Sequence, residues 1–76
     1  MKTESKLFAW EENGIFVECC ADKYVVFRPS KSGVYSETDS AYDRLDLAIC
    51  RGLYLARGKG KWAQEAMDIA AKISAK

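Results

Sequence analysis

The spacing of apolar residues along this chain changes near residue 38. Before that position, apolar residues alternate with polar ones or form short runs between turn signals, and after it they recur every three or four residues. A period of two is typical of half-buried strands, and a period near 3.6 is typical of amphipathic helices. The pattern therefore predicts an α+β fold, in which an antiparallel meander of three or four strands is followed by two helices packed on the sheet.

The first two strands are predicted at residues 6–12 and 15–20, on either side of Asn13-Gly14. This dipeptide is a strong hairpin signal, because a type I′ turn needs a positive φ at both central positions. A two-residue loop places Trp10 opposite Val17 and Phe8 opposite Cys19. In this register one face of the hairpin carries the residues that we expect in the core: Phe8, Trp10, Ile15, Val17 and Cys19.

A third strand is predicted at about residues 24–28, and the length of the preceding turn decides which side chains it buries. A three-residue turn would bury Val25 and Phe27, whereas a two-residue turn would bury Tyr24 and Val26. We favour the three-residue turn, because it buries Phe27 and leaves the hydroxyl of Tyr24 in water.

A short fourth strand at residues 34–36 would end the sheet, which then spans residues 6–36. The two helices are predicted at about 39–57 and 61–75, with glycines between them. Residues 38–40, Thr-Asp-Ser, all have side chains that can cap a helix N-terminus.

Each predicted helix has an apolar stripe. A glycine in the middle of the first stripe costs about 1 kcal/mol relative to alanine, so Gly52 indicates close packing on the sheet. The stripe of the first helix contains Ala41, Leu45, Ala48, Ile49, Gly52, Leu53 and Ala56, and that of the second contains Trp62, Ala66, Ile69, Ala70 and Ile73.

Composition places the chain among small globular proteins. Its 76 residues, 49% of them hydrophobic, are enough for one domain, residues 1–76. It contains three cysteines, an odd number that argues against a disulfide framework. We find neither a bilayer-spanning stretch nor the apolar region of a signal peptide, so we expect a cytoplasmic protein with reduced thiols and no membrane partner.

The residues needed for most enzymatic and metal chemistry are missing. The chain has no histidine, which is the commonest general base and a common neutral metal ligand. Cys19 and Cys20 would point to opposite faces of a strand, which is unsuited to a zinc site. We therefore expect no enzyme, no metal, no cofactor and no small-molecule substrate.

The first helix also carries apolar residues away from its sheet-facing stripe. Leu47, Cys50 and Tyr54 recur at helical spacing, and Arg51 lies among them. Exposed apolar side chains in a cluster indicate an interaction surface, unless the second helix covers them or helices cover both faces of the sheet. We predict that these four residues bind another protein or a second copy of the chain. By analogy with other proteins of this size, the domain would be a regulator, inhibitor or adaptor of the kind that phages and mobile elements encode.

Nucleic-acid binding is the alternative. The formal net charge is only +1, but five basic and two acidic residues follow Ala56. The basic residues Arg51, Arg57, Lys59 and Lys61, interrupted by glycines, could follow a phosphate backbone. A simpler explanation is that basic residues offset the dipole at a helix C-terminus, which glycines then end.

Overall fold

The computed structural model describes residues 6–75; the expected domain, 1–76, also includes residues 1–5 and 76, which lie outside the described part. Four antiparallel strands form one sheet in the order β1-β2-β3-β4, and two helices follow. The predicted α+β class and the meander are therefore confirmed. The elements are β1 (Lys6–Glu12), β2 (Ile15–Cys20), β3 (Lys23–Pro29), β4 (Ser36–Tyr42), α1 (Leu45–Arg57) and α2 (Ala63–Ser74).

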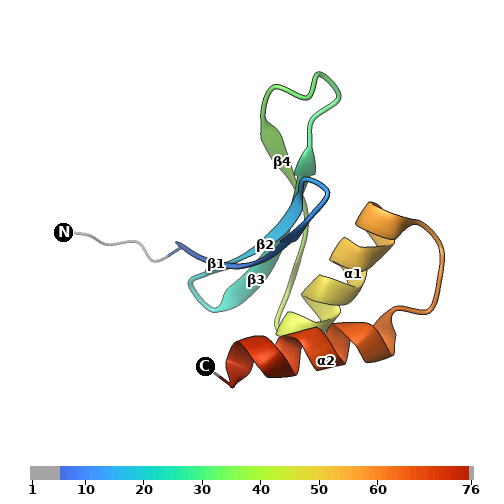
Figure 1. The fold of residues 1–76 in the computed structure, drawn as a ribbon. Coiled ribbons are helices and arrows are strands. Elements are labelled where there is room, and N and C mark those ends of the chain that lie inside the picture. The colour runs from blue at the N-terminus through green and yellow to red at the C-terminus, as the bar shows by residue number, and fades with distance from the viewer. Residues whose placement is uncertain (1–5, 76) are drawn as a thin grey trace.

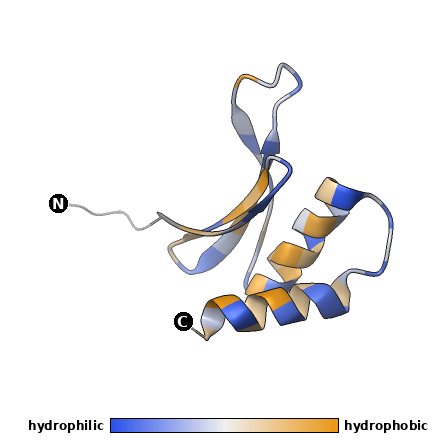
Figure 2. Ribbon diagram, viewed as in Figure 1, coloured by the Kyte–Doolittle hydropathy of each residue, from blue (hydrophilic) through white to orange (hydrophobic). Residues whose placement is uncertain are grey.

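Both helices lie on the same side of the sheet (Figure 1). Helix α1 crosses and contacts all four strands, whereas α2 packs mainly on α1. Figure 2 shows hydrophobic residues of the two helices gathered where the helices meet. The helices cover only one face of the sheet, so the arrangement with helices on both faces does not occur.

The core consists of two clusters joined by Trp10, which packs against both. One cluster lies between the sheet and α1, and the other lies between α1 and α2. Their buried members come from β2, β3 and both helices: Ile15, Val17, Val26 and Ala48 in the first cluster, and Ile49, Leu53, Ala66 and Ala70 in the second.

The hairpin between β1 and β2 turns at Asn13 and Gly14, which have φ angles of 52° and 83°. Trp10 pairs with Val17 as predicted, but a β-bulge lies between Phe8 and Trp10. The extra residue reverses the facing of Phe8, which pairs with Glu18 and is 64% exposed. The prediction that Phe8 faces the core is wrong.

The turn between β2 and β3 contains two residues, so our preference for a three-residue turn is wrong. Ala21 adopts a φ of 59°, and Val26 and Tyr24 pack in the core cluster. Phe27 lies on the opposite face and stacks on Phe16, with ring centroids 4.9 Å apart. This aromatic pair shields the Phe27 ring without placing it in the core.

Strand β4 occupies residues that the sequence pattern assigns to the start of a helix. Residues 36–42 pair with β3, so the sheet spans 6–42 rather than 6–36, and the first helix begins at Leu45 rather than at 39. The predicted strand at 34–36 and the place of Ala41 in the helical stripe are wrong as well. Pairing with β4 satisfies backbone groups along the free edge of β3, an advantage that local capping signals do not reveal.

The rest of the helical prediction is confirmed. The two stripes pack into the core from Leu45 onward, and α2 begins two residues later than predicted. Gly52 is buried and packs against the ring of Trp10. A β-carbon at this position would lie 2.5 Å from Trp10 Cζ3, which is too close for two non-bonded carbon atoms. Glycine is thus required by the close approach of the helix to β1.

Candidate functional site

The outer face of α1 carries two exposed apolar side chains. Leu47 is 45% exposed and Tyr54 is 41% exposed, although four residues of the same helix are buried. They are seven residues apart and therefore lie on the same side of the helix, two turns from each other. Because both side chains remain exposed, α2 leaves this face available for an interaction.

Arg51 lies between these two residues in the sequence and is held by β4. Its Nε donates a hydrogen bond to Oδ2 of Asp39 at 2.8 Å, and its Nη2 donates to Oδ1 at 3.1 Å. Nε of Arg28 lies 3.5 Å from Oδ1 of the same carboxylate. The guanidinium of Arg51 also lies 5.2 Å from the ring centroid of Tyr54. The two-pronged ion pair fixes the orientation of the guanidinium beside Tyr54.

Asp39 is the residue of this surface that the sequence pattern does not identify. Its side chain is only 9% exposed, and the hydrogen bonds from Arg51 lower the pKa of its carboxyl, with smaller contributions from Ser40 and Arg28. The sequence pattern makes Asp39 a candidate helix cap, and no local signal links it to a residue twelve positions away. Pairing of β4 with β3 brings the two residues together.

Cys50, the fourth predicted residue, is partly buried against the cluster between the helices. Its side chain therefore lies toward α2, at one side of the exposed stripe. The candidate surface is made mainly of Leu47, Arg51 and Tyr54, and Cys50 borders it.

Arg57 of the predicted basic segment forms ion pairs within the domain. Its guanidinium donates two hydrogen bonds to the carboxylate of Glu12, at 2.7 and 2.9 Å, and one to Glu65 at 2.9 Å. It also lies over the ring of Trp62. The hydrogen bonds from Arg57 lower the pKa of Glu12. This cation joins the end of β1 to the start of α2, so its charge is already balanced.

Lys59 and Lys61 are exposed, and in residues 6–75 neither forms an ion pair with a carboxylate. The indole of Trp62 packs closely on Gly60 and donates a hydrogen bond from Nε1 to the carbonyl of Gly58 at 2.9 Å. Two of the four predicted nucleic-acid-binding residues, these lysines, thus keep free charges, and the two arginines do not.

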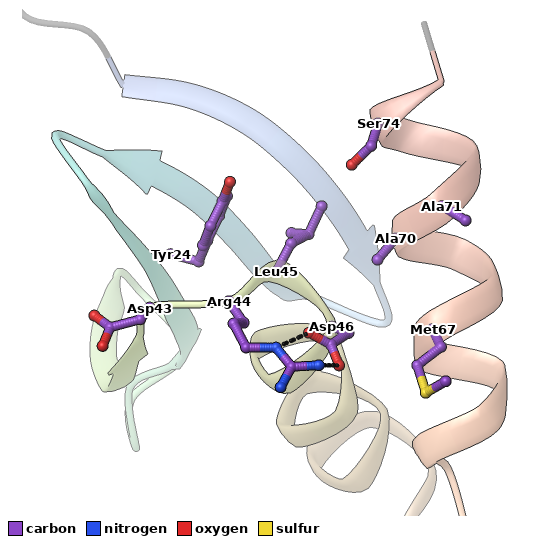
Figure 3. Close-up of a pocket in the computed structure, with 9 residues that line it drawn as sticks. All are labelled: Tyr24, Asp43, Arg44, Leu45, Asp46, Met67, Ala70, Ala71 and Ser74. Carbon is purple, nitrogen blue, oxygen red and sulfur yellow. Dashed lines mark hydrogen bonds and ion pairs between the residues drawn. The ribbon is translucent and has the colours of Figure 1, made fainter.

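A groove of about 430 Å³ opens between β3, the start of α1 and the part of α2 from Met67 to Ser74. Figure 3 shows Arg44 paired with Asp46 at this groove. Asp43 is paired with Lys23. Both carboxylates at the groove are therefore held in ion pairs. The lining residues are Tyr24, Asp43, Arg44, Leu45, Asp46, Met67, Ala70, Ala71 and Ser74.

Residues 6–75 contain no group of three or more cysteine, aspartate or glutamate side chains arranged to hold a metal ion. Neither helix within this range has the length and apolar character required to span a membrane. Comparison with protein-family models, curated proteins and solved structures found no match to the chain. The candidate surface is therefore the basis for a functional proposal.

The two lowered pKa values predict an acid-sensitive fold. Glu12 and Asp39 both have a pKa below their ordinary values of 4.5 and 3.8, so the unfolded chain takes up protons more readily than the folded one. Their contribution is complete above these values and is lost as pH falls through the lower folded pKa values. We therefore expect the urea concentration at the unfolding midpoint to decrease as the pH is lowered below about 4.5. Glu12→Gln and Asp39→Asn should each lower the midpoint at pH 7 and flatten its pH dependence; an unchanged profile in both variants would contradict this assignment.

Proposed function

We propose that this chain is a small, non-enzymatic regulatory domain that binds another protein through the outer face of α1. The contact residues are Leu47, Arg51 and Tyr54, bordered by Cys50. The observation that carries the proposal is the exposure of Leu47 and Tyr54 on either side of a fixed guanidinium.

The composition of this face supports a protein partner. Tyrosine and arginine are enriched among the residues that contribute most to protein–protein binding. Arg51 is held by Asp39 before any partner arrives, which reduces the conformational entropy lost on binding. The ring of Tyr54 and the side chain of Leu47 supply apolar area around this fixed polar group, as in the centre of many interfaces.

Leu47→Asp should strongly weaken partner binding and leave the fold intact. Leu47 is exposed in the first turn of α1, where a carboxylate is favourable to the helix dipole, so stability should change by no more than about 0.5 kcal/mol. A carboxylate in place of one of the two exposed apolar contacts should weaken binding by at least about tenfold. Affinity capture with the tagged wild type and the tagged Leu47→Asp variant compares the amount of partner protein that each retains.

The matched control is Met67→Asp, because Met67 is a similarly exposed apolar residue but lies on α2. A protein that the wild type and Met67→Asp retain, and that Leu47→Asp loses, would support the α1 surface. Equal retention by all three would show that this face is not the binding surface.

Nucleic-acid binding through Lys59 and Lys61 is the second candidate, favoured by their exposure and the lack of ion pairs to them in the described part of the chain. Fluorescence anisotropy of labelled single- and double-stranded oligonucleotides separates it from protein binding. Nucleic-acid binding would weaken steeply with salt and disappear when both lysines are replaced by glutamate. A hydrophobic protein association would be slowed by these substitutions but not abolished.

A further inference from the structure

The loop between β3 and β4, residues 30–35, is held in shape by its own hydrogen bonds. The N–H of Ser30 donates to the carbonyl of Tyr35 at 2.8 Å, and the N–H of Gly33 donates to the carbonyl of Ser30 at 3.0 Å. The hydroxyls of Ser30 and Ser32 lie 3.0 Å apart, and Ser32 Oγ accepts the N–H of Val34 at 3.3 Å. Ser30 is buried, and Gly33 has the positive φ that the turn requires. The loop is therefore pre-organised.

This ordered loop displays two large apolar residues. Val34 is 82% exposed and Tyr35 is 64% exposed, and neither belongs to the two core clusters. Packing within the domain therefore does not account for the exposed apolar groups. A rigid loop that exposes apolar side chains loses little entropy when a partner buries them.

The position of the loop indicates the shape of the partner. Figure 1 shows the end of the β3–β4 hairpin standing out beyond the β1–β2 turn and beyond both helices. A projecting tip contacts a flat surface over a small area only, but it can be surrounded inside a concave one. Lys31 is the one charged residue of the loop. A single cation contributes little affinity for a phosphate backbone, whereas it is sufficient to pair with one carboxylate at the rim of an apolar pocket.

We propose that the 30–35 loop inserts Val34 and Tyr35 into an apolar pocket of a partner protein, with Lys31 against a carboxylate at the rim. This inference rests on the proposed function, since it takes the partner to be a protein. It adds a second contact region at the far end of the β3–β4 hairpin and gives the partner a concave binding site.

Site-specific photo-crosslinking in the full-length chain tests this proposal. The probe is p-benzoylphenylalanine in place of Val34, irradiated in a lysate of cells that produce the protein, with unlabelled competitors added in excess. We expect a nuclease-resistant protein adduct that the wild-type chain suppresses. The competitor V34S/Y35S should be at least about tenfold weaker, because two buried apolar contacts are lost. Its thermal unfolding should match the wild type, since both side chains are exposed in the free domain.

Two further competitors separate the outcomes. Met67→Ser changes an exposed apolar residue on α2 and should compete like the wild type. An adduct alone does not support the loop: if V34S/Y35S competes as well as the wild type, or if the adduct is a nucleic acid, the inference is wrong. If Leu47→Asp loses competition while V34S/Y35S keeps it, the α1 surface stands and the loop contact fails; the reverse pattern supports the loop and rejects the α1 surface. If no adduct is suppressed by the wild type, the loop contact is wrong, whereas the α1 surface is decided separately by affinity capture with Leu47→Asp.

Discussion

Gly52→Ala should destabilise the domain by about 1–3 kcal/mol, the usual cost of inserting a methyl group into a tightly packed site. Helix propensity predicts the opposite, because alanine is about 1 kcal/mol better than glycine within a helix. Steric contact should outweigh propensity at this position, since the new β-carbon would lie 2.5 Å from Cζ3 of Trp10 and 3.2 Å from its Cη2. Urea unfolding of the purified domain measures the difference.

A double-mutant cycle isolates this contact. In a Trp10→Leu background, which removes the indole ring, the added methyl group should cost less than it does beside tryptophan. If Gly52→Ala stabilises the wild-type domain, or if its cost is the same in both backgrounds, the ring of Trp10 does not determine the need for glycine.

Leu53→Ala should destabilise the domain even more than Gly52→Ala, with a loss of about 2–5 kcal/mol. Leu53 is completely buried in the cluster between α1 and α2, so its truncation leaves a cavity that neighbouring side chains fill only in part. A domain of 76 residues has a total stability of about 4–11 kcal/mol. Urea unfolding should therefore show a variant that is substantially less stable, or partly unfolded, at room temperature.

Leu47→Ala is the control for this truncation, because it removes the same atoms from an exposed position of the same helix. It should change the free energy of unfolding by no more than about 0.5 kcal/mol. Equal losses for the two variants would mean that α2 does not seal the core over Leu53. The comparison also shows whether the outer face of α1 contributes to folding or is free to serve binding.

The candidate surface was only partly predictable. The spacing of Leu47 and Tyr54 places them on one side of a helix in any fold. Their exposure was not determined by spacing, since a second helix packed on the other side of α1 would have buried them. The fixed orientation of Arg51 depends on Asp39, which belongs to a different element.

The 30–35 loop shows a different limit. The sequence pattern predicts a strand that includes Val34 and Tyr35, whereas the structure places both residues in the loop before β4. A strand of three residues is at the lower end of the usual range, and it directly follows the turn-forming run Ser30-Lys31-Ser32-Gly33. These two signals together could have identified a loop with exposed apolar residues.

The sequence by itself determined the features that depend on nearby residues: the hairpin at Asn13-Gly14, the two amphipathic helices and the close packing at Gly52. Tertiary structure decided the facing of Phe8, the length of the turn at Ala21 and the assignment of residues 36–42 to a strand. For residues 36–42 the physical reason is that the side chains of Thr38, Asp39 and Ser40 suit both a helix cap and a polar edge strand. Only hydrogen bonding to β3, together with the ion pair between Asp39 and Arg51, selects the strand.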